Sequence, residues 1–248
     1  MDLKLEGRRC LVTGASAGIG AAIVKVLARE GAYVVATARR QELLQAVADS
    51  VHGAGNRRPA VIAGDITDKN EVLRIASAAS EPFGPIEILV NCAGYSMPVD
   101  IDAADEIWDD AYDLNFTAVR RISTALLPDM RQAGFGRIVN LTSVMEPMIL
   151  NATSLAKAAV HVWAKGLSRQ IAAEGVTVNC IAPGLVRTDF ARALWENPET
   201  LKRSTAGAPL RRIGEPDEIA GAAIYLASKA SSFMTGQTLV LDGGVTIG

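Results

Sequence analysis

Short runs of apolar residues alternate with longer segments of helical periodicity along the whole chain. The runs are rich in Val, Ile and Leu and cover residues 9–14, 32–38, 59–65, 86–94, 137–143, 176–184 and 237–244. Apolar residues in a continuous run, without polar alternation, are typical of strands that are buried on both faces. The pattern therefore predicts strands of a sheet that is covered on both sides.

Helix-like segments separate these runs. They lie near 18–30, 41–52, 68–80, 104–132, 152–174 and 215–228, and Asp68 and Glu215-Pro216-Asp217 are suitable helix-start residues. Alternation of strands and helices indicates right-handed βαβ units. We therefore predict an α/β fold, with one doubly wound domain over residues 1–248 and a mainly parallel sheet.

One long segment, 185–214, fits neither pattern. It contains Pro198, Gly207, Pro209 and Gly214. A connection of this length in a compact domain is more often functional than structureless. Ligands of doubly wound sheets bind beyond the carboxyl ends of the strands, so we expect this segment to be a lid over a substrate site.

The composition narrows the range of partners. Of the 248 residues, 49% are hydrophobic, 21% charged and 5% aromatic, and the formal net charge is −2. This balance gives no reason to expect a nucleic-acid partner. No apolar stretch approaches the roughly 18 residues of a membrane helix, and the N-terminus lacks a signal-peptide pattern. We expect a cytoplasmic protein without a membrane partner.

The cysteines and histidines suggest no metal chemistry. Cys10, Cys92 and Cys180 each lie in an apolar run, which predicts buried thiols in a reducing compartment. For His52 and His161 we expect core or surface roles, and no residues show metal-ligand spacing.

A glycine-rich turn, Thr13-Gly14-Ala15-Ser16-Ala17-Gly18-Ile19-Gly20, leads from the first strand into the first helix. Gly14 permits a tight turn, Gly18 lets a pyrophosphate approach the backbone, and Gly20 lets helix and strand pack closely. The spacing differs from the general G-x-G-x-x-G fingerprint, so a simple tight corner is the alternative. The position after the first strand favours nucleotide binding, with Ser16 and Ile19 in the same turn.

The end of the second strand bears on the choice between NAD and NADP. An acidic residue there would accept a bond from the ribose 2′-hydroxyl, and a basic residue would accommodate a 2′-phosphate. The chain has Ala36-Thr37-Ala38-Arg39-Arg40. Arg39, with Ser16 or Thr37 as a hydroxyl donor, suits a phosphate dianion, so we favour NADP(H) over NAD(H). The alternative is that both arginines are solvated charges at a helix start.

With these residues placed, the chain resembles a short-chain dehydrogenase/reductase, of the kind similar to 3-oxoacyl-carrier-protein reductases. The matching motifs occur in order over nearly the whole chain: TGASAGIG (13–20), GDI (64–66), NCAG (91–94), LNF (114–116), LTS (141–143), APGLVRT (182–188) and TGQTLVLDGG (235–244). The resemblance implies a seven-stranded Rossmann-type domain, hydride transfer with a nicotinamide cofactor, and a homotetramer.

The resemblance also implies cofactor-binding positions. Asp65 would hold the adenine amino group, with Ile66 in the same motif. The adenosine ribose and its surroundings would be lined by Asn91, Ala93 and Gly94. The nicotinamide side would be supported by Pro183, Gly184, Val186 and Thr188, with Thr188 near the carboxamide.

Three catalytic positions match the family, and the fourth departs from it. Asn115 would hold a proton-relay water, Ser143 would orient the substrate carbonyl, and Lys157 would bind the nicotinamide ribose. The tyrosine of the family's Y-x-x-x-K motif is replaced by Thr153, on a loop shorter than the usual one. A phenol has a pKa of about 10, and an aliphatic alcohol is a far weaker acid.

Three substitutes for the phenol are present in the sequence. Tyr95 directly follows NCAG at the end of the fourth strand, although it can equally be a wall of the pocket. Glu146 lies just beyond Ser143, where burial would raise its pKa, although it can equally be a solvated loop carboxylate. The third is water held among Ser143, Asn115 and Lys157, with Thr153 as a relay.

Three functional hypotheses follow. The first is an NADP(H)-dependent oxidoreductase that interconverts a carbonyl and an alcohol, with an apolar or mixed substrate suggested by Phe190, Leu194 and Trp195 in the lid. The second is a catalytically impaired NADP(H)-binding protein that acts as a sensor or assembly partner. The third is a non-redox enzyme similar to haloalcohol dehalogenases, which the retained glycine-rich turn disfavours.

Overall fold

Seven parallel strands form one sheet in the order β3-β2-β1-β4-β5-β6-β7. The structure is a computed structural model of the chain, and it describes residues 3–144 and 149–246. Each predicted run corresponds to one strand: β1 (Arg9–Thr13), β2 (Tyr33–Ala38), β3 (Ala60–Ala63), β4 (Ile88–Asn91), β5 (Gly136–Leu141), β6 (Val176–Pro183) and β7 (Thr238–Leu241). The predicted parallel sheet is confirmed.

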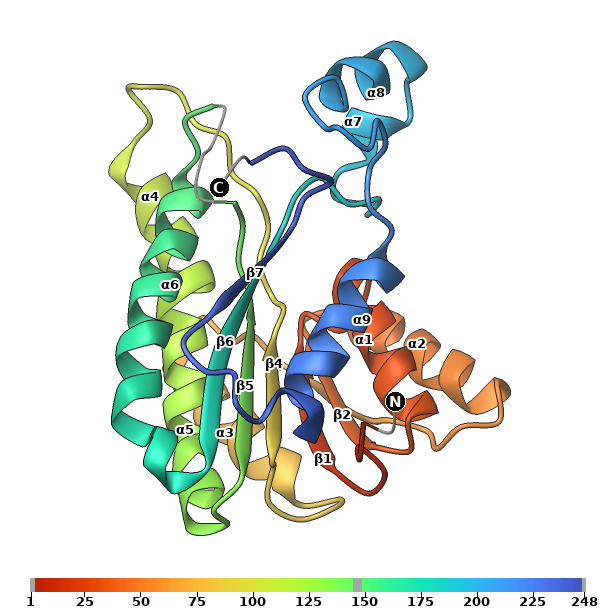
Figure 1. Cartoon of the computed structure of the whole chain (residues 1–248), viewed down its shortest axis with the longest axis vertical. Helices are drawn as coiled ribbons and strands as arrows, with labels where there is room; N and C mark the ends of the chain where they lie inside the picture. Colours follow the sequence, from red (N-terminus) through yellow and green to blue (C-terminus); the bar gives the residue numbers. More distant parts are fainter. Residues whose placement is uncertain (1–2, 145–148, 247–248) are drawn as a thin grey trace.

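Helices cover both faces of the sheet (Figure 1). One face carries α1 (Gly18–Arg29), α2 (Gln41–Gly53) and α9 (Pro216–Ala227), and the other carries α3 (Lys69–Ser80), α4 (Asp105–Tyr112), α5 (Ala118–Gln132) and α6 (Ala152–Ile171). Side chains of a strand alternate between the faces. Cys10 and Val12 accordingly belong to one buried cluster and Leu11 to the other, so two apolar cores hold the layers together.

The predicted helix starts at Asp68 and Glu215 are confirmed. The Asp68 side chain accepts hydrogen bonds from the Asn70 and Glu71 amides at the start of α3. Glu215 precedes Pro216, the first residue of α9, and forms a reciprocal capping box with Glu218. Both starts follow from polar side chains that satisfy otherwise unpaired amides.

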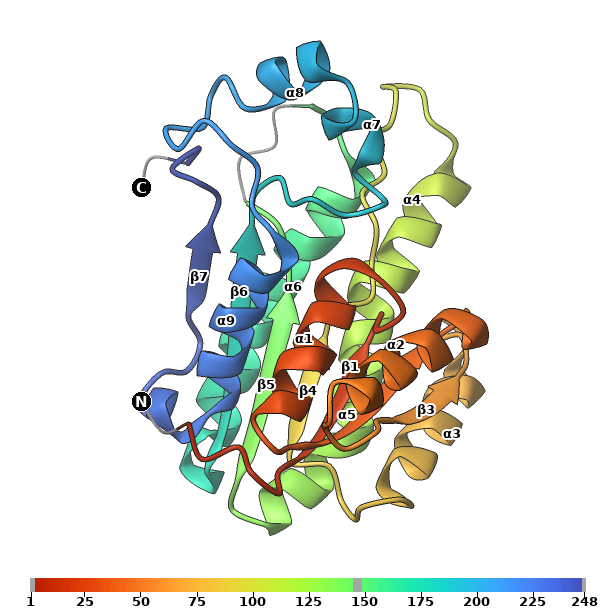
Figure 2. The same cartoon turned by 90° about the vertical axis from the view of Figure 1, so that its right-hand side faces the viewer.

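Two segments differ from the expectation. The predicted helix near 104–132 is divided into α4, a π-helical turn at Asp113–Thr117, and α5. The segment 185–214 contains two short helices, α7 (Arg192–Trp195) and α8 (Pro198–Ser204), where we expected irregular chain. Figure 2 shows α7 and α8 beyond the carboxyl ends of the strands, which is where the predicted lid belongs.

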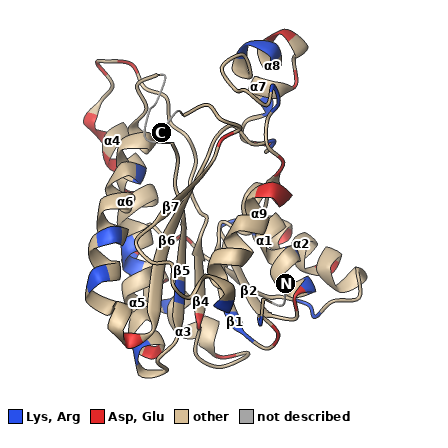
Figure 3. Ribbon diagram, in the orientation of Figure 1, with Lys and Arg blue, Asp and Glu red and all other residues tan. Residues whose placement is uncertain are grey.

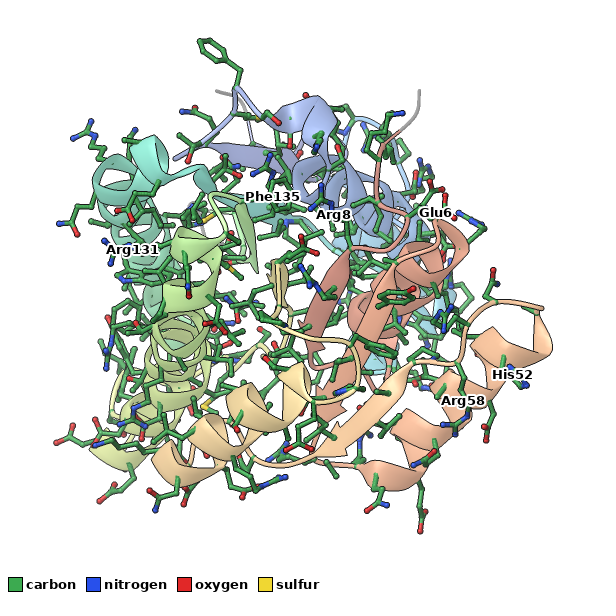
Figure 4. All side chains as sticks on the ribbon, turned by 90° about the horizontal axis from the view of Figure 1, so that it is seen from below. Glu6, Arg8, His52, Arg58, Arg131 and Phe135 are labelled. Atoms are coloured by element: carbon green, nitrogen blue, oxygen red, sulfur yellow. The ribbon has the colours of Figure 1, made fainter. Side chains whose placement is uncertain are left out.

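Charged residues lie mainly on helices and loops, while the strands contain few of them (Figure 3). Arg137 of β5 is an exception, because it is buried and donates to the carbonyls of Ser228 and Gly136. The guanidinium groups of Arg8 and Arg137 lie over the Phe135 ring, at 4.2 and 4.3 Å from its centroid; Arg8 and Phe135 are labelled in Figure 4. These contacts, which include cation–π interactions, fasten the end of α9 to the amino-terminal edge of the sheet.

The cysteines remain thiols. Cys10, Cys92 and Cys180 are free. The first and last are buried as predicted, whereas Cys92 is only partly buried. Within the described residues, no helix is long and apolar enough to cross a membrane.

Candidate active site

The glycine-rich turn forms a tight corner at the carboxyl end of β1. Gly14 and Gly18 have positive φ angles of 65° and 54°. A Cβ at Gly14 would lie 2.6 Å from the Ala93 Cα, and one at Gly20 would lie 2.3 Å from the Gly14 carbonyl oxygen. α1 begins at Gly18 without a side-chain cap. Its first amides therefore point into the corner, and they suit a pyrophosphate.

The arginine that contacts this turn is Arg40. Its Nη2 donates to the Ser16 hydroxyl at 3.3 Å, whereas Arg39 is exposed and makes no such contact. The Thr37 hydroxyl is buried and donates to the Ile62 carbonyl at 2.7 Å, so it is not free for a phosphate. The contact of a basic residue with the turn is thus made by Arg40 and Ser16, and the role of Arg39 at a 2′-phosphate stays a prediction.

The predicted adenosine positions differ in how their side chains are used. Asp65 Oδ1 accepts hydrogen bonds from the Thr67 amide and hydroxyl, which fixes the carboxylate after β3, and the adjacent Ile66 is buried. The Asn91 side chain is buried and donates to Ser123 and Asn140. It therefore joins β4 to α5 and β5, and its Oδ1 is buried without a partner among the described residues; its role at the ribose stays a prediction.

Ala93 and Gly94 are placed by close backbone packing. The Ala93 amide donates to the Thr13 hydroxyl at 3.1 Å, which couples the ends of β1 and β4. A Cβ at Gly94 would lie 2.5 Å from Asn115 Oδ1 and 3.6 Å from Lys157 Cε. Asn115 and Lys157 thus meet beside Gly94, although they come from the π-helical turn and from α6.

The predicted nicotinamide-side residues follow β6. Pro183 ends the strand. Gly184 lies so close to Asp242 that a Cβ atom on residue 184 would be 2.8 Å from the Asp242 Cα. Val186 is buried and forms an isolated bridge with Gly214. The Thr188 methyl group would lie 3.1 Å from a Cβ on Gly18, so Thr188 faces the glycine-rich turn.

Lys157 is held at the end of β5. Its Nζ donates to the Thr142 carbonyl at 3.3 Å, and burial lowers the pKa of its ammonium group from the ordinary 10.5, while nearby Cys92 acts in the opposite direction. An ammonium group can donate three hydrogen bonds. The other two donors are therefore suited to ribose hydroxyls.

Two buried polar atoms near Lys157 have no partner among the described residues, Asn115 Oδ1 and Ser143 Oγ. The Asn115 amide group does donate, to the Ala111 carbonyl at 3.0 Å, and its side chain is only 2% exposed. Buried polar atoms are rarely left without a hydrogen bond. The orphaned atoms indicate a place for a ligand or water, so these residues fit a site that holds a polar group.

Thr153 has a different task from the one expected. Its hydroxyl donates to the Tyr95 carbonyl at 2.8 Å, and the residue is only 4% exposed. A hydroxyl has one hydrogen to donate, and here that hydrogen is committed to the backbone. The predicted relay role of Thr153 does not fit this geometry.

The other two candidate proton donors have different outcomes. Tyr95 is partly buried, and its ring lies 6.2 Å from that of Phe190 in a tilted arrangement, which places it on the wall between the site and the lid. Glu146 lies outside the described residues, and its role stays a prediction.

Two cavities flank the site, and neither is lined by Ser143, Asn115 or Lys157. One of about 520 Å³ lies between α1, the chain after β6 and the start of α9, lined by Gly18, Ala21, Ala22, Lys25, Arg187, Thr188, Asp189, Trp195, Glu215, Pro216 and Asp217. The other, of about 540 Å³, follows β4 and is lined by Met97, Pro98, Val99, Asp100, Asp102, Ala103 and Ile107. The candidate site is therefore located by the unpartnered atoms of Asn115 and Ser143, and not by these two cavities.

His161 and Arg40 are the residues near the site that sequence reasoning missed. His161 lies one turn after Lys157 and contacts the Ser143 carbonyl. The spacing of four residues along α6 was a usable signal, because residues so spaced share a helix face.

A nucleotide cradle on β1, together with serine, lysine and asparagine beyond β4 and β5, defines a dinucleotide-dependent enzyme on a doubly wound sheet. The chain belongs to the short-chain dehydrogenase/reductase family and is an enzyme of that class. A family model described as enoyl-(acyl carrier protein) reductase matches residues 14–246.

Relatives match the chain over nearly its whole length. The 3-oxoacyl-[acyl-carrier-protein] reductase FabG of Vibrio cholerae serotype O1 is 38% identical over 98% of this chain and 99% of its own. Dehydrogenase/reductase SDR family member 4 of Bos taurus is 34% identical over 97% and 88%. The structure of L-sorbose reductase from Gluconobacter frateurii, complexed with NADPH and L-sorbose, matches with a TM-score of 0.93 at 30% identity, covering 100% of both chains. These similarities support a nicotinamide cofactor.

Proposed function

We propose that this protein interconverts a carbonyl and an alcohol by hydride transfer, with NADP(H) as its cofactor. The observation that carries the proposal is the pair of buried, unpartnered polar atoms, Ser143 Oγ and Asn115 Oδ1, at the same edge of the sheet as Lys157 and the glycine cradle. Such a set can hold a sugar hydroxyl, a carbonyl oxygen and a water.

The preference for NADP(H) rests on Arg40 and Ser16. Their contact places a guanidinium and a hydroxyl together beside the cradle, and no acidic residue lies between Tyr33 and Arg40. A guanidinium and a hydroxyl donate to a phosphate dianion, whereas a carboxylate would repel it. The structure of L-sorbose reductase contains NADPH, which agrees with this assignment.

The residues of this chain would bind and orient the reactants. A nicotinamide, when bound, supplies or accepts the hydride. Lys157 would donate its free N–H groups to ribose hydroxyls, and the Ser143 hydroxyl would donate to the substrate carbonyl oxygen and polarise it. Asn115 Oδ1 would accept from a water.

In carbonyl reduction, the proton that reaches the substrate oxygen would come from this water, which would regain a proton from the solvent, because the Thr153 hydrogen is donated to the Tyr95 carbonyl. A positioned general acid contributes about 10²–10⁴ to a rate. We therefore expect slow turnover, supported by orientation and hydrogen bonding.

We also propose that the segment 185–214 closes over an apolar or mixed substrate. Phe190 and Leu194 in this segment and Ile149 and Leu150 before α6 are exposed large apolar side chains. The ring of Tyr95 contacts that of Phe190, so the lid and the β4 side of the site already meet. Closure over a substrate would cover these surfaces and exclude water.

The second candidate is an NADP(H)-binding protein without catalysis. The observation in its favour is the engagement of the Thr153 hydroxyl by the backbone. In this case the nucleotide site and Lys157 would still bind the cofactor, and the protein would act as a sensor or assembly partner.

Binding and turnover measurements separate these candidates. We expect NADPH to bind more tightly than NADH in a fluorescence titration, and absorbance at the nicotinamide band to change slowly with some members of a panel of ketones and alcohols. Arg40→Ala should weaken NADPH binding about tenfold, because it removes a charge-assisted bond of about 1.5 kcal/mol or more, and it should leave NADH binding unchanged.

The neighbouring Arg39→Ala is the matched control, since Arg39 does not contact the cradle in the structure. Binding of NADPH without turnover on any substrate would favour the second candidate. Absence of binding by either nucleotide would overturn both, and equal losses in the two arginine variants would contradict the role of Arg40.

We propose in addition a homotetramer in the cytoplasm. Two separate surfaces carry exposed apolar side chains, Leu155 and Val162 on α6, and Phe233 and Val240 at the β7 edge. Two independent self-complementary surfaces assemble four copies with dihedral symmetry. The three free thiols agree with a reducing compartment.

A further inference from the structure

His161 connects the active-site serine with the edge strand of the sheet. Its Nε2 lies 3.3 Å from the Ser143 carbonyl oxygen, and its Nδ1 lies 2.9 Å from the Thr238 hydroxyl. Thr238 is the first residue of β7, and Ser143 follows β5. The imidazole thus bridges two segments that β6 separates in the sheet.

The two partners determine which ring nitrogen carries hydrogen. A carbonyl oxygen only accepts, so Nε2 must be the protonated nitrogen that donates to Ser143. In the neutral ring Nδ1 is then an acceptor, and the Thr238 hydroxyl can donate to it. Burial lowers the pKa of His161 from 6.5, and the positive charge of Lys157 on the same helix adds to this, while the bond to Ser143 acts against it. These effects together favour the neutral ring.

Lys157 and His161 hold consecutive carbonyl groups. Lys157 donates to the Thr142 carbonyl and His161 to the Ser143 carbonyl. Both side chains project from α6 one turn apart, so the helix fixes the chain after β5 at two successive points. The Ser143 hydroxyl has no partner among the described residues, and its position therefore depends on its backbone.

From this geometry, and on the basis of the proposed function, we propose that His161 is a positioning residue for Ser143. It would hold the Ser143 backbone so that the hydroxyl faces the substrate carbonyl, with Thr238 fixing the plane of the ring. His161 does not donate a proton to the substrate, because its Nε2 hydrogen goes to a carbonyl that cannot pass it on. Its role resembles that of a residue that orients a catalytic group through a hydrogen bond.

The test uses the full-length protein and variants that separate positioning from folding. His161→Leu removes both hydrogen bonds, whereas His161→Gln keeps an N–H donor for Ser143 and an acceptor for Thr238. His52→Gln is the matched control, because His52 is the other histidine and lies exposed in the last turn of α2 (Figure 4). NADPH affinity, kcat and KM are measured for each.

We expect His161→Leu to lower kcat about tenfold while NADPH affinity and KM change less than twofold. His161→Gln should recover most of kcat, and His52→Gln should match the wild type. Equal kcat in the leucine variant and the wild type would overturn the proposal. Equal losses in the leucine and glutamine variants would also overturn it, because they would indicate a merely structural role.

A second measurement does not depend on turnover. Hydrogen exchange of the peptide that covers residues 138–144 should be at least fivefold faster in His161→Leu than in the wild type or His161→Gln. In a ¹H–¹⁵N spectrum of histidine-labelled protein, the Nε2 hydrogen of His161 should be protected from exchange with water. A wild type without turnover would contradict the proposed function, and unchanged exchange rates would separately overturn the anchoring of Ser143.

Discussion

At Lys157, one ammonium group would serve both the fold and the proposed cofactor. In the structure it donates to the Thr142 carbonyl, and the remaining two donors are available to a ribose. Lys157 is therefore a residue whose removal should affect binding as well as rate. Thr153, four residues earlier on the same helix, donates its hydroxyl hydrogen to the Tyr95 carbonyl and so stabilises the backbone.

Lys157→Ala is expected to weaken NADPH binding about a hundredfold or more and to lower kcat. The physical reason is the loss of hydrogen bonds from a charged donor, each worth about 1.5–3 kcal/mol. Because burial lowers the Lys157 pKa from 10.5, wild-type affinity should begin to fall at a pH below 10.5 as the ammonium deprotonates, and the variant should lack this decline.

Fluorescence titration with NADPH between pH 7 and 10 checks both parts of this expectation. Lys165→Ala is the control, since Lys165 lies on the same helix and is exposed. Unchanged cofactor affinity in Lys157→Ala would show that the lysine does not hold the ribose.

At the residue scale, backbone requirements were easier to predict than side-chain directions. The positive φ angles of Gly14 and Gly18 follow from a turn that must be tight, and the sequence spacing alone indicates it. The contact of Arg40 with Ser16 depends on a partner that only the folded chain brings near. The same holds for Thr37 and Thr153, whose hydroxyls donate to backbone carbonyl groups. The pattern of neighbouring residues in the sequence does not indicate those partners.

Among the elements, the start of α6 is the one that shapes the site most directly. The Asn151 Oδ1 atom caps the helix by accepting hydrogen bonds from the Thr153 and Ser154 backbone amides. The Nδ2 group of the same side chain donates to the Ser96 hydroxyl. The Val99 amide donates to the Leu150 carbonyl. The loop after β4, which carries Tyr95, is therefore fastened to the helix that carries Lys157.

Asn151→Ala is expected to destabilise the protein by about 2 kcal/mol, at the upper end for a lost helix cap, because Asn151 is buried and also holds the loop. Urea unfolding gives the free energy, and hydrogen exchange of residues 96–99 should accelerate.

The chain offers a matched control in Asn197, which caps the short exposed helix α8 in the same way. Asn197→Ala should change the free energy of unfolding by less than about 1 kcal/mol, because α8 frays at little cost to the core. Equal losses in the two variants would contradict the special role of the α6 start.

The existence and order of the strands and main helices could be predicted from apolar periodicity, because burial on both faces imposes it. The π-helical turn at Asp113–Thr117 could not, although Asn115 lies in it. One extra residue in a helical turn leaves the apolar spacing nearly intact, and the turn forms where packing against α4, α5 and α6 requires it. Such turns often mark functional positions, so its agreement with the candidate site is informative.

For the molecule as a whole, the two apolar surfaces on α6 and at the β7 edge would form the contacts of the proposed homotetramer. Val162 is 73% exposed and Phe233 fully so. Burying such side chains contributes about 25 cal/mol per Å² of apolar surface, and a charge placed among them would oppose association.

Val162→Glu and Phe233→Glu are each expected to convert the proposed tetramer into a dimer, and the double variant should be a monomer. Sedimentation velocity measures the species, and circular dichroism confirms that the fold is retained. A wild type that sediments as a monomer would contradict the homotetramer. Leu73→Glu, on exposed surface of α3, is the control and should leave the mass unchanged.

The order of the strands in the sheet also determines how the chain must fold. β1 lies between β2 and β4, and the Arg9 guanidinium beside it bonds to Glu87, 78 residues further along the chain. During synthesis, β1 to β3 emerge before β4, the strand that pairs with the other side of β1. Strands that are far apart in the sequence pair slowly, because the chain loses the entropy of closing a long loop before the stabilising contacts form. Until β4 arrives, β1 is an open edge, and an unpaired apolar edge is prone to aggregation. The strand that later leads into the glycine-rich turn is thus the one whose protection depends on β4, which begins only at Ile88.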